Sequence, residues 1–287
     1  MTLCFFVSDL HGQTARYHKL FERIVSEKPP IVFMGGDLLP AVRSTFSPSD
    51  EHRPVEFLQY FEASLKMIRE KNPERYPELF LIHGNDDPAS AVEALQEGET
   101  KGLWKWMHKK RVVWNQFSIY GYACVPPTPF LLKDWERYDV SRFIDPGSVA
   151  PEEGWHSVPY DEDELRNTTI QEELNQLIDK DDLSNAVFLF HASPYRSKLD
   201  RAALDGKSIE HVPLDVHIGS IAIQRFIEQR QPLLTLHGHV HESSRLTGEW
   251  KEKIGRTVAI SAAIDCRELS LIRFELEAPE NATRELV

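Results

Sequence analysis

Five short polar clusters in this chain consist mainly of residue types that bind metal ions, and each directly follows an apolar run. The clusters are Asp9-Leu10-His11-Gly12, Gly35-Gly36-Asp37, Gly84-Asn85-Asp86-Asp87, His191 and Gly238-His239-Val240-His241. They offer carboxylate oxygens, imidazole nitrogens and one amide oxygen, but no thiolate. That set of donors suits manganese, iron or zinc, and it argues against a structural zinc site rich in cysteine.

The number of candidate ligands predicts two ions rather than one. Seven side chains are too many for a single ion that keeps a position open for substrate, but they fit two ions that share one carboxylate. In two-metal hydrolytic sites such ions lie roughly 3.5–4 Å apart.

Buried strands must position these residues. Short apolar runs bounded by glycine-rich turns are typical of strands in an α/β sheet. The runs that precede the clusters are Leu3–Val7, Ile31–Met34, Leu79–Ile82, Ala186–Phe190 and Pro232–Leu236. Residues just beyond strand ends face the crevice where such sheets bind ligands. In extended backbone, residues two apart project to the same side, so each Asp-x-His or His-x-His pair can aim two donors at one point.

The pattern of the first half predicts a mostly parallel sheet with helical crossovers. Amphipathic stretches near Gln13–Ser26 and Val55–Glu70 alternate with the first three strands, separated in one place by a Pro/Ser-rich loop at Pro40–Arg53. Further helices are expected at Glu162–Lys180 and Leu214–Gln229. The remaining expectations are short strands at Val112–Val113 and Phe117–Ala123, two antiparallel strands at Arg256–Ala263 and Leu269–Glu277, and a frayed end at Ala278–Val287.

The segment at about 125–161 differs in character from the rest. It is rich in both proline and aromatic residues, so it is unsuited to regular elements and too apolar for a disordered linker. We expect an ordered insertion in a single domain that spans residues 1–287. The sequence leaves open whether the insertion is a lid beside the cleft or a structural flap.

Composition limits the class of protein. The chain has 287 residues, a formal net charge of -12 and only three cysteines, which are far apart. The acidic balance makes a nucleic-acid partner unlikely and disfavours binding to an anionic membrane, since both require a positive surface. The cysteine pattern and the lack of any run of membrane-spanning length indicate a soluble, cytoplasmic protein with reduced thiols. The sequence does not indicate an oligomeric state.

The ordered blocks Asp9-x-His11, Gly36-Asp37, Gly84-Asn85, His191 and Gly238-His239-x-His241 together resemble the calcineurin-like metallophosphoesterase superfamily. The resemblance implies an α/β fold, a four-layer α/β/β/α sandwich of two mixed sheets. It also implies roles for the seven ligands. Asp9, His11 and His241 would bind the first metal, Asn85, His191 and His239 the second, and Asp37 would bridge both.

The implied activity is metal-dependent hydrolysis of a phosphomonoester or phosphodiester of a small molecule by direct attack of a metal-held hydroxide. Two divalent or trivalent ions (Mn, Fe or Zn) would be the cofactors. The alternative is a non-catalytic binding or scaffold module that keeps the fold. The protein Ser/Thr phosphatase branch is disfavoured, because Leu38-Leu39-Pro40 follows Asp37 where that branch has Asp-Arg-Gly.

The chain departs from the family pattern at Asp86. Related sequences commonly carry a histidine after the asparagine, and that histidine stabilises the transition state or protonates the leaving group. Here Asp86 occupies the position. We expect either a protonated Asp86, another imidazole such as His83 or His217, or solvent to replace it. Asp86 and His217 are therefore the candidate catalytic residues, although helix capping or surface exposure is the more ordinary interpretation of His217.

Overall fold

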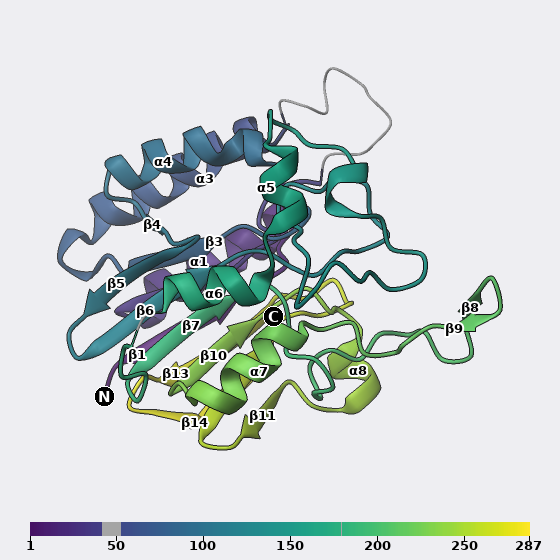
Figure 1. Ribbon diagram of the computed structural model, residues 1–287. Coiled ribbons are helices and arrows are strands. Elements are labelled where there is room, and N and C mark those ends of the chain that lie inside the picture. Colours follow the sequence, from purple (N-terminus) through teal and green to yellow (C-terminus); the bar gives the residue numbers. More distant parts are fainter. Residues whose placement is uncertain (42–52, 179) are drawn as a thin grey trace.

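Two six-stranded sheets lie at the centre of the structure, a computed structural model that describes residues 1–41, 53–178 and 180–287 (Figure 1). The first sheet has the order β14 (Ala278–Leu286), β13 (Ser270–Glu275), β1 (Leu3–Val7), β2 (Ile31–Gly35), β3 (Glu78–Ile82), β4 (Lys105–Trp106). Strands β1 to β4 are parallel, whereas β13 pairs antiparallel with both β1 and β14. This sheet is therefore mixed.

The second sheet is mixed in the same way. Its order is β11 (Lys251–Ile254), β12 (Thr257–Ser261), β10 (Leu234–His237), β7 (Ala186–Phe190), β6 (Phe117–Tyr122), β5 (Lys110–Trp114). The four inner strands are parallel, and the two edge strands are antiparallel to their neighbours. The predicted strands before the five polar clusters are thus all present, and they are inner strands of one sheet or the other.

Alternation along β1 shows how the layers form. Cys4 and Phe6 pack into the core between the two sheets, whereas Phe5 and Val7 pack on the opposite face under α1 (Thr14–Glu27), α3 (Arg53–Lys71) and α4 (Val92–Thr100). On the far side of the second sheet, α6 (Ile170–Leu177) and α7 (Ile221–Arg230) cover the strands and lie side by side (Figure 1). The predicted four-layer α/β/β/α sandwich is confirmed.

Several predicted boundaries were wrong for local reasons. The helix expected at Glu162–Lys180 is two helices, α5 (Glu162–Asn167) and α6, because Thr169 forms a capping box with Glu172 and starts a new helix. The helix expected from Leu214 begins at Ile221, where the Ser220 side chain accepts a hydrogen bond from the Ile223 amide.

The C-terminal expectations also need correction. Residues 278–287 are not frayed, because β14 pairs with β13 at both of its ends, on either side of an irregularity between Arg273 and Glu275. The strands expected to be an antiparallel pair, β12 and β13, lie in different sheets. Most of the loop expected at Pro40–Arg53 lies outside the described residues.

Residues 125–161, predicted to form an insertion, contain one short 3-10 helix, η3 (Pro151–Glu153), and are otherwise held mainly by buried polar contacts. The side chains of Lys133 and Glu136 are both fully buried and form an ion pair at 2.5 Å, and Glu136 also accepts a hydrogen bond from the Thr128 amide. Asp139 accepts hydrogen bonds from the Ile221 and Ala222 amides, which fixes the insertion to the first turn of α7.

Within the described residues, no helix is both long and apolar enough to span a membrane.

Candidate metal centre

The carboxyl ends of five parallel strands meet at one edge of the sandwich. Strands β1, β2 and β3 belong to the first sheet and β7 and β10 to the second, and each is followed by one or two of the predicted ligands. The sheet arrangement therefore gathers ligands that are up to 232 positions apart in sequence, as the contact between Asp9 and His241 shows.

One group of donors surrounds Asp9. The Nε2 atom of His241 lies 3.2 Å from Oδ1 of Asp9 and 3.3 Å from Nε2 of His11, which lies 3.9 Å from Oδ2 of Asp37. The four residues offer one ligand atom each within 4.8 Å of one another. Adjacent ligands on one ion lie about 3.0–3.4 Å apart when each bond is about 2.1 Å, so this spacing suits a metal ion.

A second group of donors shares Asp37 with the first. The Nε2 atom of His191 lies 3.3 Å from Oδ2 of Asp37 and 3.2 Å from Oδ1 of Asn85. The ring centroid of His239 is 5.2 Å from that of His191. All seven predicted ligands are therefore brought together, with Asp37 in contact with both groups.

The ligands are aimed by an unusual backbone rather than by extended strand. Four of them have left-handed φ angles, namely 58° at Asp9, 48° at His11, 50° at Asp37 and 72° at His239. Leu10, between Asp9 and His11, is buried, but the backbone around it is a turn and not an extended strand. Such conformations cost roughly 1–3 kcal/mol each and are concentrated at functional sites.

Two glycines are required by close approach to the ligands. A Cβ atom on Gly84 would lie 2.1 Å from Oδ1 of Asp37, and one on Gly238 would lie 2.8 Å from Oδ2 of Asp9. Neither distance is tolerable for a side chain. The glycines in these clusters therefore leave room for the carboxylates.

The donor set fits a cation in two further respects. The Oδ2 atom of Asp9 is buried and has no hydrogen-bond partner among the described residues. Burial of such an oxygen is costly unless an ion binds to it. The Nδ1 atom of His191 is 2.8 Å from the carbonyl oxygen of Gly35. With Nδ1 donating to the carbonyl, the Nε2 atom of the neutral ring has a lone pair that can bind a metal ion, as in metal-ligating histidines.

The charges of the site also favour a cation. Burial opposes ionisation of Asp9, but the hydrogen bond and charge of His241 outweigh it and hold the pKa of Asp9 at about 2. Burial likewise opposes the charge of His191, yet Asp37 raises the pKa of that imidazole to about 10. Burial and the charge of His191 lower the pKa of His239 to about 3, so His239 is neutral. The buried carboxylates of Asp9 and Asp37 are therefore stabilised by positive charge close to them.

Comparison with known proteins agrees with this geometry. A profile of the calcineurin-like phosphoesterases matches residues 4–243 of the chain. The chain belongs to the calcineurin-like phosphoesterase family. No curated protein sequence matches it.

Solved structures agree on the fold of this calcineurin-like phosphoesterase. One crystal structure aligns with a TM-score of 0.60 at 17% identity, over 99% of this chain and 98% of that one. The protein TT1561 of Thermus thermophilus aligns with a TM-score of 0.56 at 15% identity, over 99% of this chain and 98% of that one. Likeness at this level of identity concerns the fold alone.

Asp87, for which the sequence predicted no role, connects two of the loops that carry predicted ligands. Its buried carboxylate accepts hydrogen bonds from the amides of Leu38 at 3.1 Å, Leu39 at 2.7 Å and Gly84 at 2.9 Å. It therefore fixes the loop that follows Asp37 to the loop that carries Asn85. A second carboxylate directly after a ligand cluster was the only signal for it in the sequence.

Asp86 lies at the edge of the ligand set. Its Oδ2 atom is 3.7 Å from Nδ1 of His11, its Oδ1 atom accepts a hydrogen bond from Asn85, and its amide donates to Asp37. Burial and the neighbouring charge of Asp37 raise the pKa of Asp86 to about 7. Asp86 therefore faces the site and does not point away from it.

The two histidines proposed as replacements are placed differently. The ring of His83 stacks on Trp135 at 4.2 Å, and its Nδ1 atom accepts a hydrogen bond from the indole of Trp106. His217 donates from Nδ1 to the buried carboxylate of Asp200 at 2.7 Å. Neither ring is among the described residues that line the cavity beside the ligands, although Asp215 and Ile218 on either side of His217 are.

A cavity of about 640 Å³ opens beside the seven predicted ligands, which together form the candidate metal-ligand cluster. Its lining includes Asp37, Asn85, Asp86, His239 and His241, and it extends to residues 126–148 of the insertion and to the segment between β7 and α7. The insertion therefore forms one wall of the cavity that contains the ligands.

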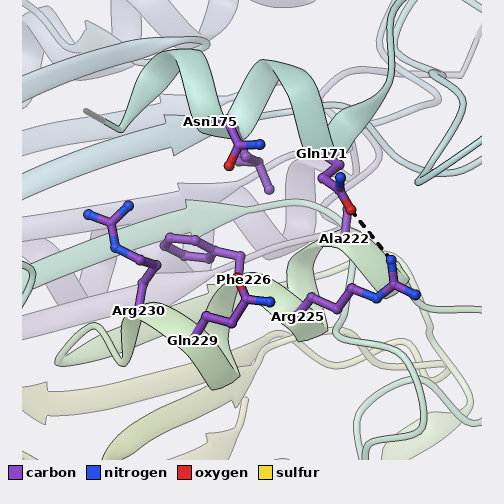
Figure 2. A pocket seen from close by; sticks show the side chains of 8 residues that line it. Gln171, Asn175, Ala222, Arg225, Phe226, Gln229 and Arg230 are labelled. Carbon is purple, nitrogen blue, oxygen red and sulfur yellow. Dashed lines mark hydrogen bonds between the residues drawn. The ribbon is translucent and has the colours of Figure 1, made fainter. Parts of the chain in front are cut away.

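A separate hollow lies between α6 and α7 on the outer face of the second sheet (Figure 2). Arg225 donates to Gln171 across it, and Phe226 forms part of its floor. None of the described residues that line it is an acid or a histidine, so the hollow lacks the side-chain donors that manganese, iron or zinc would require.

Proposed function

We propose that this chain is a binuclear metal-dependent phosphoesterase that hydrolyses a monoester or diester of a small phosphorylated molecule. The observation that carries the proposal is the position of Asp37, whose carboxylate is in contact with His11 in one donor group and with His191 in the other. A carboxylate shared by two donor groups is the arrangement that two-metal hydrolytic sites use.

The proposed ligand sets follow from the two groups. Asp9, His11 and His241 would hold one ion and Asn85, His191 and His239 the other, with Asp37 bridging. Nitrogen and oxygen donors without thiolates suit manganese, iron or zinc. When bound, such ions polarise a phosphoryl oxygen and activate water near neutral pH.

The residues of the chain supply position and charge. Asp87 holds the loops of Asp37 and Asn85 together, so the bridging carboxylate and the amide ligand keep a fixed separation. The cavity wall formed by the insertion would hold the organic part of the substrate next to the ligands, and orientation of this kind contributes a large part of a catalytic barrier reduction.

We propose that Asp86 faces the leaving-group side of the substrate. It lines the cavity and is 3.7 Å from His11, where the family commonly places a histidine. Its role would be to select the class of ester, not to bind a metal. His217 remains a predicted catalytic residue, held by Asp200 and adjacent in sequence to Ile218, which lines the cavity.

We also propose a cytoplasmic location, as the sequence suggested. Cys4 and Cys124 are free thiols buried in the core, and Cys266 is free and partly exposed. Unpaired thiols are typical of proteins in reducing compartments.

The test is the metal content of the purified protein together with turnover of 4-nitrophenyl phosphate and bis(4-nitrophenyl) phosphate. Two equivalents of metal and turnover that is lost in Asp37→Asn would support the proposal. Absence of both metal and turnover would favour the non-catalytic binding or scaffold module, which the replacement of the usual histidine by Asp86 also allows.

A further inference from the structure

Much of the cavity lining outside the metal-ligand cluster is apolar. Prolines, aromatic residues and aliphatic side chains from the insertion and from the segment before α7 face the same space. They are Pro126, Pro127, Pro129, Phe130, Phe143 and Ile144 from the insertion, with Leu204, Ile209, Leu214 and Ile218 from the segment before α7. Asp37 and His241 line the same cavity. An apolar group bound against these side chains would therefore lie next to a phosphoryl group bound at the ligands.

Apart from two histidines, the charged side chains of the lining are all acidic. Six acidic residues contribute to it, and none of its described residues is lysine or arginine. Two of the acids already form hydrogen bonds within the protein. Asp139 accepts hydrogen bonds from the first turn of α7, and Asp215 accepts one from the hydroxyl of Tyr195. Apart from ions at the cluster, this cavity offers no lysine or arginine among its described residues to pair with a second phosphate or a carboxylate on the substrate.

The mouth of the cavity carries exposed apolar side chains. Phe143 is 73% exposed, Phe130 58% and Ile209 40%. Ile209 belongs to the hairpin of β8 (Ser208–Ile209) and β9 (Val212–Pro213), which stands out beside the insertion in Figure 1. The hairpin meets the insertion closely, since a Cβ on Gly147 would lie 2.2 Å from Cδ1 of Ile209. Apolar side chains gathered in this way at a cavity mouth mark a binding site.

We infer that the substrate is a phosphate ester with one bulky apolar group, alkyl or aryl, and no second anionic group. The inference rests on the proposed function, because it assumes that the phosphoryl group is held at the metal-ligand cluster. The apolar group would occupy the wall formed by the insertion and the segment before α7. Nucleotides and sugar bisphosphates, which carry further negative charge, would be poor substrates.

Binding of alkylphosphonates tests this without turnover. Isothermal titration calorimetry of the Mn²⁺-loaded protein would compare ethylphosphonate, octylphosphonate and 7-carboxyheptylphosphonate. Each buried methylene is worth about a fourfold gain in affinity, so burial of even two or three of the six additional carbons predicts at least about tenfold tighter binding of octylphosphonate than of ethylphosphonate. The terminal carboxylate of the third compound should remove most of that gain. Equal affinities, or no detectable binding of octylphosphonate, would overturn the inference.

Variants locate the apolar group. The double substitution Phe130→Ala with Phe143→Ala should weaken octylphosphonate by at least about threefold and leave ethylphosphonate unchanged. Leu131→Ala is the matched control, because Leu131 is 53% exposed in the same insertion but does not line the cavity. Equal effects of the double variant and the control on octylphosphonate would also overturn the inference.

The two proposals fail separately. Turnover of 4-nitrophenyl esters without any trend along the alkyl series would leave the proposed function standing and remove this inference. A clear alkyl trend without turnover of any ester would remove the proposed function and leave only a site that binds alkylphosphonates.

Discussion

Asp37 and His191 lie 3.3 Å apart, although one follows a strand of the first sheet and the other a strand of the second. The contact joins the carboxyl ends of β2 and β7 across the interface between the sheets. A complete ligand set therefore requires both sheets to be folded and packed together. Loss of metal binding in a variant thus needs a separate measurement of folding before it is assigned to a ligand.

Asp37→Asn should remove the shared ligand. The amide keeps the size of the side chain but loses the charge and one acceptor, so we expect loss of at least one equivalent of metal and at least about a 100-fold fall in turnover. Metal analysis and steady-state kinetics measure both. Asp145→Asn is the control, because Asp145 is an exposed acid that lines the same cavity outside the ligand set. Equal losses in the two variants would contradict the bridging role.

Asp87→Ala should destabilise the protein through the two loops that it joins. Three buried amides, those of Leu38, Leu39 and Gly84, would lose their acceptor. We expect the free energy of unfolding to fall by about 3–5 kcal/mol, measured by urea denaturation. Asp182→Ala, at an exposed carboxylate that bonds Ser184 two residues away, should have a much smaller effect. If Asp87→Ala and Asp182→Ala had the same urea midpoint, the positioning role of Asp87 would be refuted.

Gly84→Ala should displace the bridging carboxylate. The new Cβ would lie 2.1 Å from Oδ1 of Asp37, so the side chain of Asp37 or its loop must move. We expect weaker metal binding with the fold retained, seen as reduced metal content and an unchanged far-UV circular dichroism spectrum. At Gly206 a Cβ would meet nothing within 4 Å, and its φ of +68° confines the cost of Gly206→Ala to the backbone. Full metal content in Gly84→Ala would mean that the close approach does not matter.

Asp86→Ala should leave two-metal occupancy intact. Asp86 contacts His11 and Asn85 but is outside the proposed ligand set. Turnover of 4-nitrophenyl esters should stay within about tenfold of wild type, because a good leaving group needs little protonation, whereas esters of alkyl alcohols should lose more. Loss of a metal in this variant would show that Asp86 is a ligand.

The contribution of the insertion to the stability of the protein should depend on pH through Asp134. Burial opposes ionisation of Asp134, but His156, Ser157 and the amide of Ala89 outweigh it and lower its pKa from the usual 3.8. A lowered pKa in the folded state contributes stability that is complete well above pH 3.8 and is lost as the pH falls through the folded-state value. The difference in unfolding free energy between wild type and Asp134→Asn should therefore shrink below about pH 4. A difference that is constant between about pH 3 and about pH 6 would contradict this.

Much of the candidate site could be predicted from the sequence because its ligands follow inner strands. Runs such as Leu3–Val7 and Ala186–Phe190 are apolar on both faces, and both are strands with those same bounds. The convergence of Asp37 and His191 then follows from parallel strands ending at one edge. The expectation of extended backbone at the ligands was wrong. The left-handed turns at Asp9 and His239 are stabilised by tertiary contacts that the spacing of the residues does not reveal.

Features that depend on long-range pairing could not be predicted. The sequence Ala278–Leu286 alternates poorly and contains Pro279, yet it forms a strand because β13 offers an edge to pair with. The role of Asp87 depends on amides almost fifty positions away. The cavity combines the insertion with the segment before α7, and the sequence left open whether the insertion lies beside the cleft.

The central claim is that two ions share Asp37. Anomalous diffraction from crystals grown with Mn²⁺ tests it most directly. We predict two peaks about 3.5–4 Å apart on either side of the Asp37 carboxylate, one near Asp9, His11 and His241 and the other near Asn85, His191 and His239. A single peak, or no peak within coordination distance of Asp37, would contradict the account.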